Sequence, residues 1–524
     1  MTLVYPFFLF LFLPAFLACF ALAGRLGGNR GALFTLIAAS LVFTVSQGMP
    51  FLIVMVASAL LNAVLLFAAA SPTTTPTQRG RIVGIGITLN ILLLVLVKYS
   101  VWLQWLPGIG PLSATLGALI PTTLSFLTFQ RAVALLDVLG QREDVTRGLE
   151  TPPPGKLASL ADPTLRYSAF ATMFPTLLIG PITYLVEVLP QFARSSFGRL
   201  RGIDLSIGLT LVSIGIFKKF VLADQIGSDW VDQVYAQVAA GHTVSSGQTL
   251  TALLAYYVQL YFDFSGYSDI ALGVARMIGI TLPINFDSPL RATGIIDFYR
   301  RWHMTLTRVI ARFLFTPLSI AGSRFAARRR MKGVPAKIVS LWGPLLINFT
   351  IIGLWHGARL TFVLFGLIHG TWYVIETEWK NARWWKKRRA AIAERWRLTG
   401  GAIIAIPLLI VTFALFRSPT LDVFGKMMRS LVAHRPAEAP LHQDPTAVPI
   451  ILLACAVAAF MPNAYELLRR YRGGIPSFVN PSRTLSIFRF HWRPTLVWAA
   501  GSGVLMLVAM RKMTVIVPFV YQVF

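Results

Sequence analysis

Long runs of apolar residues recur along most of the chain and are separated by short polar segments. Many of these runs approach the roughly 20 residues that an α-helix needs to cross a bilayer, because a helix rises about 1.5 Å per residue. The first run, Leu3 to Ala23, lacks both a basic flank and a clean cleavage site, so we expect a retained helix rather than a signal peptide. The pattern predicts an all-α polytopic membrane protein with roughly twelve transmembrane helices, plus re-entrant or interfacial helices.

The expected spans follow from the positions of the polar segments. They are Leu3 to Ala23, Leu33 to Val45, Phe51 to Ala70, Ile82 to Leu106, Leu112 to Leu136, Ile203 to Leu222, Leu250 to Val274, Ile338 to Trp355, Leu360 to Ile375, Ala402 to Phe416, Val448 to Phe460 and Thr495 to Phe519.

Two stretches between these spans have a different pattern. Tyr167 to Leu189 contains Pro175, Gly180 and Pro181 between two basic segments, so we expect it to enter and leave the membrane on one face. Residues 285–336 mix arginines with aromatic and aliphatic residues, which favours an interfacial or re-entrant layer over a span.

Charge then orients the chain. The 48 Lys and Arg residues outnumber 21 Asp and Glu, giving a net charge of +27, and they gather in short loops between apolar runs. This is the positive-inside pattern of a multi-pass membrane protein and not a nucleic-acid groove, so the expected partners include membrane lipids and no nucleic acid. It places both termini outside the cytoplasm. A loop with Asp224, Asp229 and Asp232, free of Lys and Arg, fits the outer face.

With 55% hydrophobic and 13% charged residues, the chain is far too apolar for a soluble protein of several domains. We therefore expect one membrane-embedded domain over 1–524, with N-terminal helices at 1–140, a core at 165–380 and C-terminal helices at 400–524. Neither cysteine has a partner at metal-binding or redox spacing, so no metal site is expected. No nucleotide-binding or serine-hydrolase motif is present.

His356 is the most informative single residue. It lies at the turn between the apolar runs Ile338 to Trp355 and Leu360 to Ile375. A polar imidazole at such a position is costly, so we expect it to have a hydrogen-bond partner or a function. Gly353 and Gly357 are four residues apart, so a helix or ligand can approach that face closely. The alternatives are a structural histidine bonded to a carbonyl and a general base for a hydroxyl.

His303, 53 residues before His356, follows Arg300, Arg301 and Trp302. One interpretation is an interfacial segment whose arginines meet lipid headgroups. The other is that Arg300, Arg301 and His303 orient an anionic or thioester-carrying donor, since the guanidinium fork grips phosphate or carboxylate in two places.

Asp263 and Asp269 lie six residues apart in an apolar span. Six residues turn a helix through about 600 degrees, so the two carboxylates point to different sides and form no dyad. They either bond neighbouring side chains and lock the packing or take part in a proton relay. Lys218 and Lys219, at the end of a span, are expected to extend to the interface.

Several of these segments together resemble the membrane-bound O-acyltransferase (MBOAT) family, in particular its bacterial alginate O-acetyltransferases and teichoic-acid D-alanyl transferases. The motifs that carry the resemblance occur in series over much of the chain. They are Leu124 to Gln130, Phe174-Pro175 with Gly180-Pro181, Phe217 to Lys219, Tyr261 to Asp269, Pro283 to Phe286 with Pro289, Asp297 to His303, and Leu354 to Ala358.

The resemblance implies a location in the bacterial cytoplasmic (inner) membrane, a catalytic core at 165–380 and a central tunnel. It also implies acyl transfer from a cytoplasmic thioester, acetyl-CoA or an acyl carrier, to a hydroxyl group outside. His356 occupies the position of the family's near-invariant histidine and His303 that of its second conserved histidine, which implies catalytic roles for both. The matching motifs also imply substrate-binding positions. These are Arg300, Arg301, Trp302, Trp355, Asp263, Asp269 and Asn285.

The expected function is acetyl transfer to an exported polysaccharide or an extracytoplasmic partner protein, with the thioester as a co-substrate and no bound cofactor. D-alanyl or lipid acyl transfer is an alternative within the same family. A polysaccharide or lipid transporter is an alternative from another class, against which the absence of an internal repeat counts. A structural subunit of a synthase complex is a third.

Overall fold

The computed structural model describes residues 2–103, 106, 108–119, 124–140, 142–149, 161–388, 392, 394–433, 436–438, 447–477, 490–513 and 519–520. Across these residues the chain is helical and contains no β-strand, only an isolated bridge between Pro283 and Ile475. The predicted all-α fold is confirmed.

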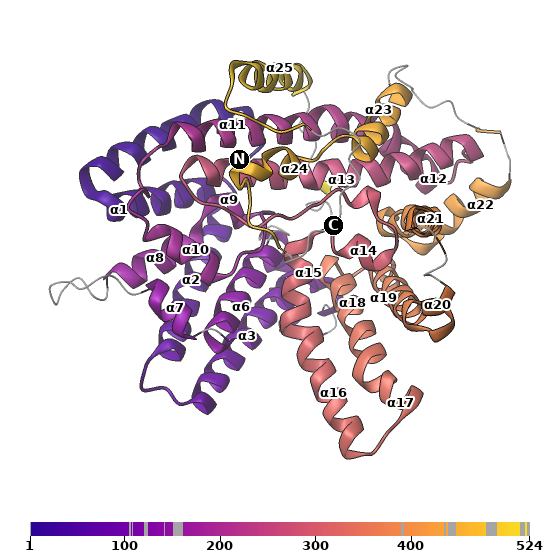
Figure 1. The fold of residues 1–524 in the computed structure, drawn as a ribbon, viewed down its shortest axis with the longest axis horizontal. Coiled ribbons are helices and arrows are strands. Elements are labelled where there is room, and N and C mark those ends of the chain that lie inside the picture. The colour runs from indigo at the N-terminus through magenta and orange to yellow at the C-terminus, as the bar shows by residue number, and fades with distance from the viewer. Residues whose placement is uncertain are drawn as a thin grey trace.

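The N-terminal helices form one side of the molecule (Figure 1). They are a π-helical turn at Phe8–Phe12, α1 (Leu13–Val45), α2 (Met49–Ala70), α3 (Pro76–Lys98), α4 (Ser100–Leu103), α5 (Ile109–Leu119), α6 (Leu124–Gly140) and α7 (Arg142–Leu149).

The first two expected spans are the two halves of α1. The helix breaks at Gly28, whose φ of 58° is in the left-handed region that favours glycine. The halves then approach each other so closely that a Cβ on Gly31 would lie 2.3 Å from the carbonyl oxygen of Ala23. The basic segment around Arg25 and Arg30 therefore lies at a turn, as predicted.

The central helices follow. They are α8 (Ala161–Thr172), α9 (Phe174–Leu177), α10 (Leu185–Phe192), α11 (Gly202–Phe217), π-helical turns at Lys218–Asp224 and Gly227–Val231, α12 (Asp232–Ala239), α13 (Ser246–Met277), a 3-10 turn at Pro289–Arg291, α14 (Ile295–Tyr299), α15 (Met304–Ile310), a π-helical turn at Ala311–Phe315, α16 (Thr316–Arg328), α17 (Gly333–Lys337), a π-helical turn at Ile338–Trp342, α18 (Gly343–His356) and α19 (Leu360–Asn381).

The C-terminal helices pack on the other side and across the top of the view in Figure 1. They are α20 (Arg383–Arg388), α21 (Glu394–Arg417), α22 (Leu421–Ala433), α23 (Ala447–Phe460), α24 (Ala464–Leu468), a 3-10 turn at Arg469–Tyr471 and α25 (Leu496–Lys512).

The described part of the chain holds eight helices long and apolar enough to cross a membrane, or nine if the bent pair Val448–Phe460 and Ala464–Tyr471 is one span. The expected twelve are therefore not all present as single helices. Within the expected span Leu112 to Leu136 the structure describes α5 up to Leu119 and α6 from Leu124, and α25 ends at Lys512.

Two expectations about the central region need correction, and a third agrees with the structure. The predicted loop with Asp224, Asp229 and Asp232 is helical, because the π-helical turns carry the chain from α11 directly into α12. Residues 304–328, expected to form an interfacial layer, are a continuous helix of membrane-spanning length. Tyr167 to Leu189 is broken between α9 and α10, as its prolines predict, and is almost wholly buried.

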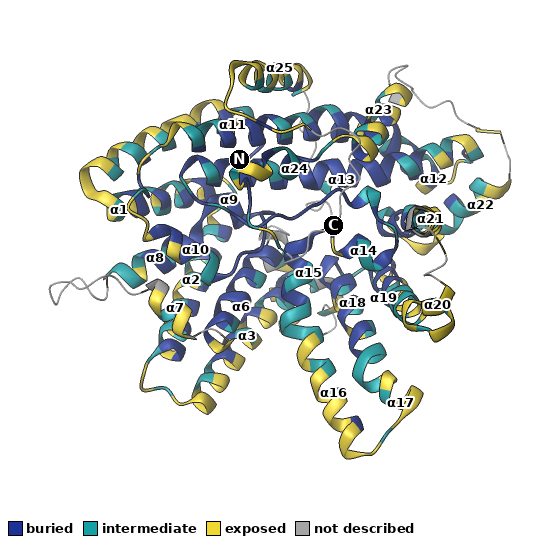
Figure 2. Ribbon diagram, in the orientation of Figure 1, coloured by how far each residue is buried: buried dark blue, intermediate teal, exposed yellow. Residues whose placement is uncertain are grey.

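The core is built around α13. Figure 2 shows this helix buried along nearly all its length, while α1, α3, α16 and α25 expose one side. On the outer helices the exposed side chains are apolar, with Leu60 and Val64 of α2 and Ile403 and Ile404 of α21 all more than 60% exposed. In a multi-pass membrane protein such side chains face lipid.

Glycines let α11 and α13 pack with their backbones in contact. A Cβ on Gly215 would lie 2.5 Å from the carbonyl oxygen of Gly266, and one on Gly208 would lie 2.6 Å from that of Gly273. Small residues at such crossings allow close helix approach in membranes. This crossing places the end of α11 beside the middle of α13.

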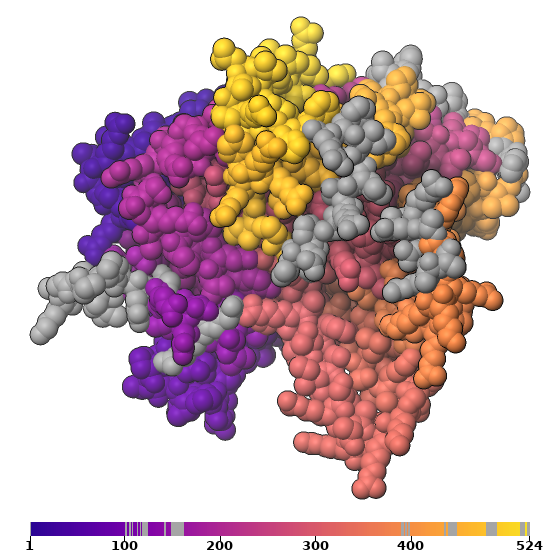
Figure 3. Space-filling model, in the orientation of Figure 1, coloured from indigo at the N-terminus to yellow at the C-terminus, as the bar shows by residue number. Residues whose placement is uncertain are grey.

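The hairpin of α16 and α17 projects from one end of the molecule (Figure 3). Its tip carries four exposed basic residues, Arg328, Arg329, Arg330 and Lys332. Basic side chains gathered at a hairpin tip agree with the predicted placement of charge in the short loops between apolar runs.

Near the other end of the chain, Phe519 is buried against Tyr267 of α13. The backbone N–H of Val520 donates to Asp263 at 2.9 Å. The ammonium of Lys219 also lies 4.5 Å from the ring centroid of Phe519. These two residues therefore pack directly on α13 and on the π-helical turn after α11.

Candidate active site

His356 is the last residue of α18, at the turn of the α18–α19 hairpin. The hairpin closes tightly because α18 presents glycine to α19: a Cβ on Gly353 would lie 2.2 Å from the carbonyl oxygen of Phe362. The Gly357 N–H donates to Leu354 O at 3.0 Å and ends the helix. The close approach expected from Gly353 and Gly357 is confirmed.

Aromatic rings surround His356, which is only 7% exposed. The ring centroids of Trp355 and of Phe416, from α21, lie 4.9 Å and 4.8 Å from the imidazole. Phe362 of α19 lies at 6.1 Å. The histidine therefore occupies a water-poor enclosure, in which electrostatic interactions are stronger than in solvent.

His303 immediately precedes α15 and is 3% exposed. Its backbone is left-handed, with φ 42° and ψ 50°, which is uncommon for a residue other than glycine. The surrounding structure holds it there: the Met304 N–H donates to Asn285 O at 2.9 Å, and Thr307 N–H donates to His303 O at 3.1 Å. Strained residues held by their surroundings cluster at functional sites.

Hydrogen bonds to Asn285 determine the tautomer of His303. The Thr305 backbone N–H and hydroxyl both donate to Asn285 Oδ1, at 3.3 Å and 2.9 Å, so this atom is the amide oxygen. His303 Nδ1 lies 3.0 Å from the same oxygen and therefore carries the ring proton. Burial lowers the pKa of His303 to about 3, so the ring is neutral at pH 7.

The remaining nitrogen of His303, Nε2, is buried and has no hydrogen-bond partner among the described residues. In the tautomer fixed by Asn285 it bears a lone pair and can only accept. A buried acceptor without a partner is costly, and one in an enclosed site is suited to a ligand hydroxyl.

Trp355 lies between the two histidines, 4.9 Å from His356 and 6.0 Å from His303 by ring centroids. Its indole N–H is also buried without a partner in the described part of the chain. Phe126 of α6 lies 5.3 Å from Trp355 and 6.3 Å from His303. The structure thus brings together two histidines that are distant in sequence, around one tryptophan.

Residues 300–302 have other contacts. Arg301 pairs with Asp297 at 3.0 Å and donates to Asp287 O, while Arg300 is exposed. Trp302 is buried between Phe286 and Phe298. The predicted role of the two arginines toward a donor stays a prediction.

Asp263 is buried and Asp269 is partly buried, and both form ion pairs with consecutive lysines. Lys218 pairs with Asp269 at 2.6 Å, and Lys219 pairs with Asp263 at 2.7 Å and with Asp224 at 2.6 Å. These pairs agree with the alternative in which each carboxylate bonds a neighbouring side chain. The proton-relay alternative and the substrate-binding role of both residues stay predictions.

The expectation that the lysines reach the interface is wrong. The Lys219 side chain is 1% exposed, because the glycine crossing places the end of α11 directly against the carboxylates of α13.

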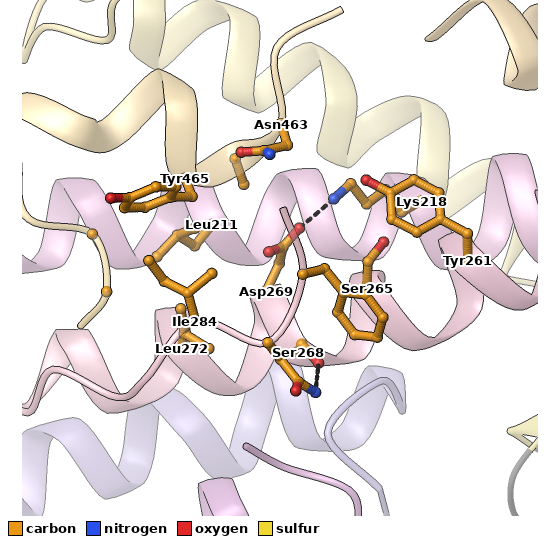
Figure 4. A pocket seen from close by; sticks show the side chains of 15 residues that line it. Leu211, Lys218, Tyr261, Ser265, Ser268, Asp269, Leu272, Ile284, Asn463 and Tyr465 are labelled. Atoms are coloured by element: carbon orange, nitrogen blue, oxygen red, sulfur yellow. Dashed lines mark hydrogen bonds and ion pairs between the residues drawn. The ribbon is translucent and has the colours of Figure 1, made fainter. Parts of the chain in front are cut away.

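A small polar pocket adjoins the histidines through Asn285. Figure 4 shows the Lys218–Asp269 pair facing Ser265 and Ser268 within it. Asn285 Nδ2 donates to Ser268 Oγ at 3.2 Å, so one amide joins this pocket to His303. The hydroxyl of Ser265 is buried and has no partner among the residues that the structure describes.

Sequence reasoning missed Lys98 and Tyr99, at the end of α3, which contact the last turn of α18. Lys98 Nζ donates to Trp355 O at 2.5 Å, and the Tyr99 hydroxyl donates to Leu354 O. Their only sequence signal is a Lys-Tyr pair inside the apolar run Ile82 to Leu106. The described residues contain no cluster of His, Cys, Asp and Glu that could hold a metal ion.

The chain matches known proteins over its central part. Residues 158–390 match the sequence model of the membrane-bound O-acyltransferase family. A peptidoglycan O-acetyltransferase of Helicobacter pylori is 34% identical over 331 residues, which are 60% of this chain and 61% of that protein.

Two further kinds of relative match. A probable alginate O-acetylase AlgI of Pseudomonas aeruginosa is 30% identical over 60% of this chain and 56% of its own length. A teichoic acid D-alanyltransferase of Streptococcus thermophilus is 38% identical over 21% of this chain and 26% of its own. The chain spans about three fifths of the length of the acetylating relatives. Both histidines and Asn285 lie within 158–390.

Proposed function

We propose that this chain, whose residues 158–390 form a domain of the membrane-bound O-acyltransferase family, transfers an acetyl group to a hydroxyl group outside the cytoplasm. The donor is a thioester on the cytoplasmic side, and the acceptor is an exported polysaccharide or an extracytoplasmic partner protein. The names of the peptidoglycan and alginate relatives support the acetyl group and the polysaccharide.

The observation that carries the proposal is the pair of buried imidazoles on either side of Trp355. In the proposed reaction His356 accepts the proton of the acceptor hydroxyl as its oxygen attacks the thioester carbonyl. The carbon–sulfur bond then breaks, and the proton passes from His356 to the leaving thiolate. One ester and one thiol are formed, and no net proton is released.

His303 has a complementary role in this mechanism. Asn285 holds the His303 ring so that its unpaired Nε2 is a neutral acceptor, and Nε2 receives a hydrogen bond from a second, non-reacting hydroxyl of the incoming acceptor. His303 then orients the nucleophile while His356 removes the proton. Orientation of this kind is worth several kcal/mol of barrier, about 7 to 11 in the most favourable cases.

The test measures acetyl esters on exported polysaccharides by NMR, in strains with the native chain, with His356→Ala or with no chain. Membrane levels of the protein are matched by immunoblot. We expect esters only with the native chain, and D-alanyl esters and polymer yield unchanged in all three. His369→Gln is the matched control, because His369 is also buried but bonds Tyr299 and Thr412 within the helices.

The same strains separate the alternatives. Lost D-alanyl esters with unchanged acetyl esters would contradict acetyl transfer and favour D-alanyl transfer. Lost polymer in the His356→Ala strain would favour a transporter. Esters that persist with His356→Ala would contradict the proposed role of His356.

A further inference from the structure

At the turn that carries His356, several backbone carbonyl oxygens need hydrogen-bond donors from outside the helix. The last four carbonyls of an α-helix have no partner within the helix, and α18 ends at His356 inside the molecule. A backbone polar group without a partner is costly where water is excluded. The partners of these carbonyls therefore determine how firmly the turn is held.

Two of these carbonyls have side-chain donors from α3 and the residue that follows it, 255 positions or more before the turn, in addition to the Gly357 N–H that bonds Leu354 O. The Tyr99 hydroxyl donates to Leu354 O, and Lys98 Nζ donates to Trp355 O at 2.5 Å. The Trp355 carbonyl belongs to the peptide group that joins Trp355 to His356. Fixing this peptide fixes the backbone that carries the catalytic imidazole.

Lys98 also contacts side chains of two helices, α6 and α18, that line the site. Its ammonium donates to Ser125 Oγ on α6 at 3.2 Å and lies 5.8 Å from the Trp355 ring centroid. Ser125 directly precedes Phe126, whose ring packs on Trp355. One ammonium group thus connects α3, α6 and α18 beside Trp355, whose ring packs near both histidines. A cation is also favourable at a helix C-terminus.

We propose that Lys98 and Tyr99 are positioning residues for acyl transfer, which hold the Trp355–His356 turn in its reactive geometry. This inference rests on the proposed function. It implies that the N-terminal helices, outside the matched residues 158–390, are part of the active-site assembly. A displacement of the base by about 1 Å can cost about 100-fold in rate, whereas the donor's binding is left unchanged.

The test uses membranes from a strain that lacks the chromosomal copy and carries each variant of the full chain. Release of free thiol from acetyl-CoA is measured over a range of acetyl-CoA concentrations, with the membrane's own acceptors present. The variants are Lys98→Met, Lys98→Arg and Tyr99→Phe. Lys426→Met, which removes an exposed partner of Asp422, is the matched control.

We expect Lys98→Met to lower kcat about 10- to 100-fold with KM for acetyl-CoA within about twofold. Lys98→Arg keeps the charge and donors and should recover about tenfold of that loss. Tyr99→Phe, which removes one hydroxyl, should lower kcat severalfold, and Lys426→Met should match the native chain. Detergent-solubilised melting temperatures show whether each variant folds.

Three results would overturn the inference. The first is an unchanged kcat in Lys98→Met. The second is a raised KM for acetyl-CoA with native kcat in Lys98→Met, which would mean that Lys98 binds the donor. The third is no recovery of kcat in Lys98→Arg. If Lys98→Met does not fold, the kcat of Tyr99→Phe tests the inference instead, because this variant keeps the aromatic ring and loses only the hydroxyl that bonds Leu354 O. His356→Ala membranes separate the two proposals: equal thiol release in native and His356→Ala membranes overturns the proposed function itself.

Discussion

Asn285 governs the chemistry of His303 through a single side-chain amide. Its oxygen receives bonds from the Thr305 N–H and hydroxyl and from His303, and its nitrogen donates to Ser268. The sequence motif indicated Asn285 only as a substrate-binding position. In the structure it contacts the histidine, so its first role is to set which ring nitrogen carries the proton.

Replacing Asn285 should therefore impair catalysis through His303. Asn285→Ala removes the acceptor of the His303 Nδ1 proton and frees the ring to adopt either tautomer, and we expect acetyl transfer to fall about 10- to 100-fold. Thiol release from acetyl-CoA in membranes measures this. Asn62→Ala, which alters a buried amide pair between α2 and α3, is the control. Equal losses in both would contradict a specific role.

The neutrality of His303 predicts a pH dependence of stability. Its pKa is lowered to about 3 by burial, against about 6.5 when unfolded, so the unfolded state binds the proton first. The contribution of this group to stability is complete above about pH 6.5 and declines as the pH falls toward 3. Between pH 7 and pH 5 the loss amounts to about 2 kcal/mol from this group.

The check compares melting temperatures at pH 7 and pH 5. We expect the drop to be smaller in His303→Asn than in the native chain. The drop should keep its native size in His242→Asn, whose side chain is exposed. A drop of native size in His303→Asn would contradict a buried neutral ring.

At the scale of elements, the glycine crossing of α11 and α13 determines what the lysines can reach. Backbone contact at Gly215 and Gly266 places Lys218 and Lys219 against the carboxylates of α13. Gly215→Ala would bring a Cβ within 2.5 Å of a carbonyl oxygen, which only a shift of the helices can relieve. We expect a lower melting temperature and a smaller monodisperse fraction in detergent.

The same helix pair offers a matched control. A Cβ added at Gly247, in the first turn of α13, meets nothing within 4 Å. Gly247→Ala should be neutral or stabilise by up to about 1 kcal/mol, because alanine favours helix. Fluorescence-detected size exclusion after heating compares the two variants, and equal behaviour would mean that the crossing is not tightly packed.

The sequence predicted elements best where one apolar run made one helix, as in α2, α13 and α19. It failed where tertiary contacts changed the local pattern. Lys218 and Lys219 end an apolar run and look exposed, but their partners on α13 lie 51 and 44 residues later. The acidic residues 224–232 look like a loop, yet they continue a helix in which Asp224 pairs with Lys219.

For the candidate site, the motifs identified both histidines. Only the folded structure shows that both lie near the ring of Trp355. Lys98 lies inside the expected span Ile82 to Leu106, where a lysine needs a partner, but the sequence could not identify that partner. Its contacts depend on how α3 packs beside α18. The roles assigned to Arg300, Arg301 and the histidines stay predictions.

At the scale of the whole molecule, the distribution of basic residues predicts which end faces the cytoplasm. The tip of the α16–α17 hairpin gathers Arg328, Arg329, Arg330 and Lys332, all exposed. Basic residues in short loops are retained on the cytoplasmic side of a bacterial inner membrane. We therefore expect this tip inside the cell and the N-terminus outside it.

Cysteine labelling in intact cells measures this topology. The background carries Cys19→Ala and Cys455→Ala, which remove both native cysteines. Single cysteines are then introduced as Thr2→Cys at the N-terminus and Lys332→Cys at the hairpin tip. We expect a membrane-impermeant maleimide to label the first in intact cells and the second only after the cells are lysed. The reverse pattern would contradict the predicted orientation.

The bond from Val520 to Asp263 has a consequence for biosynthesis. The two residues are 257 positions apart, so α13 is made long before Val520 is translated, and until then one oxygen of Asp263 lacks its final donor. Phe519 likewise covers Lys219 only at that late stage. These two contacts on α13 therefore form only after residues 519 and 520 have been translated, and a nascent chain that stops before them retains the Lys219–Asp263 pair without the cover of Phe519.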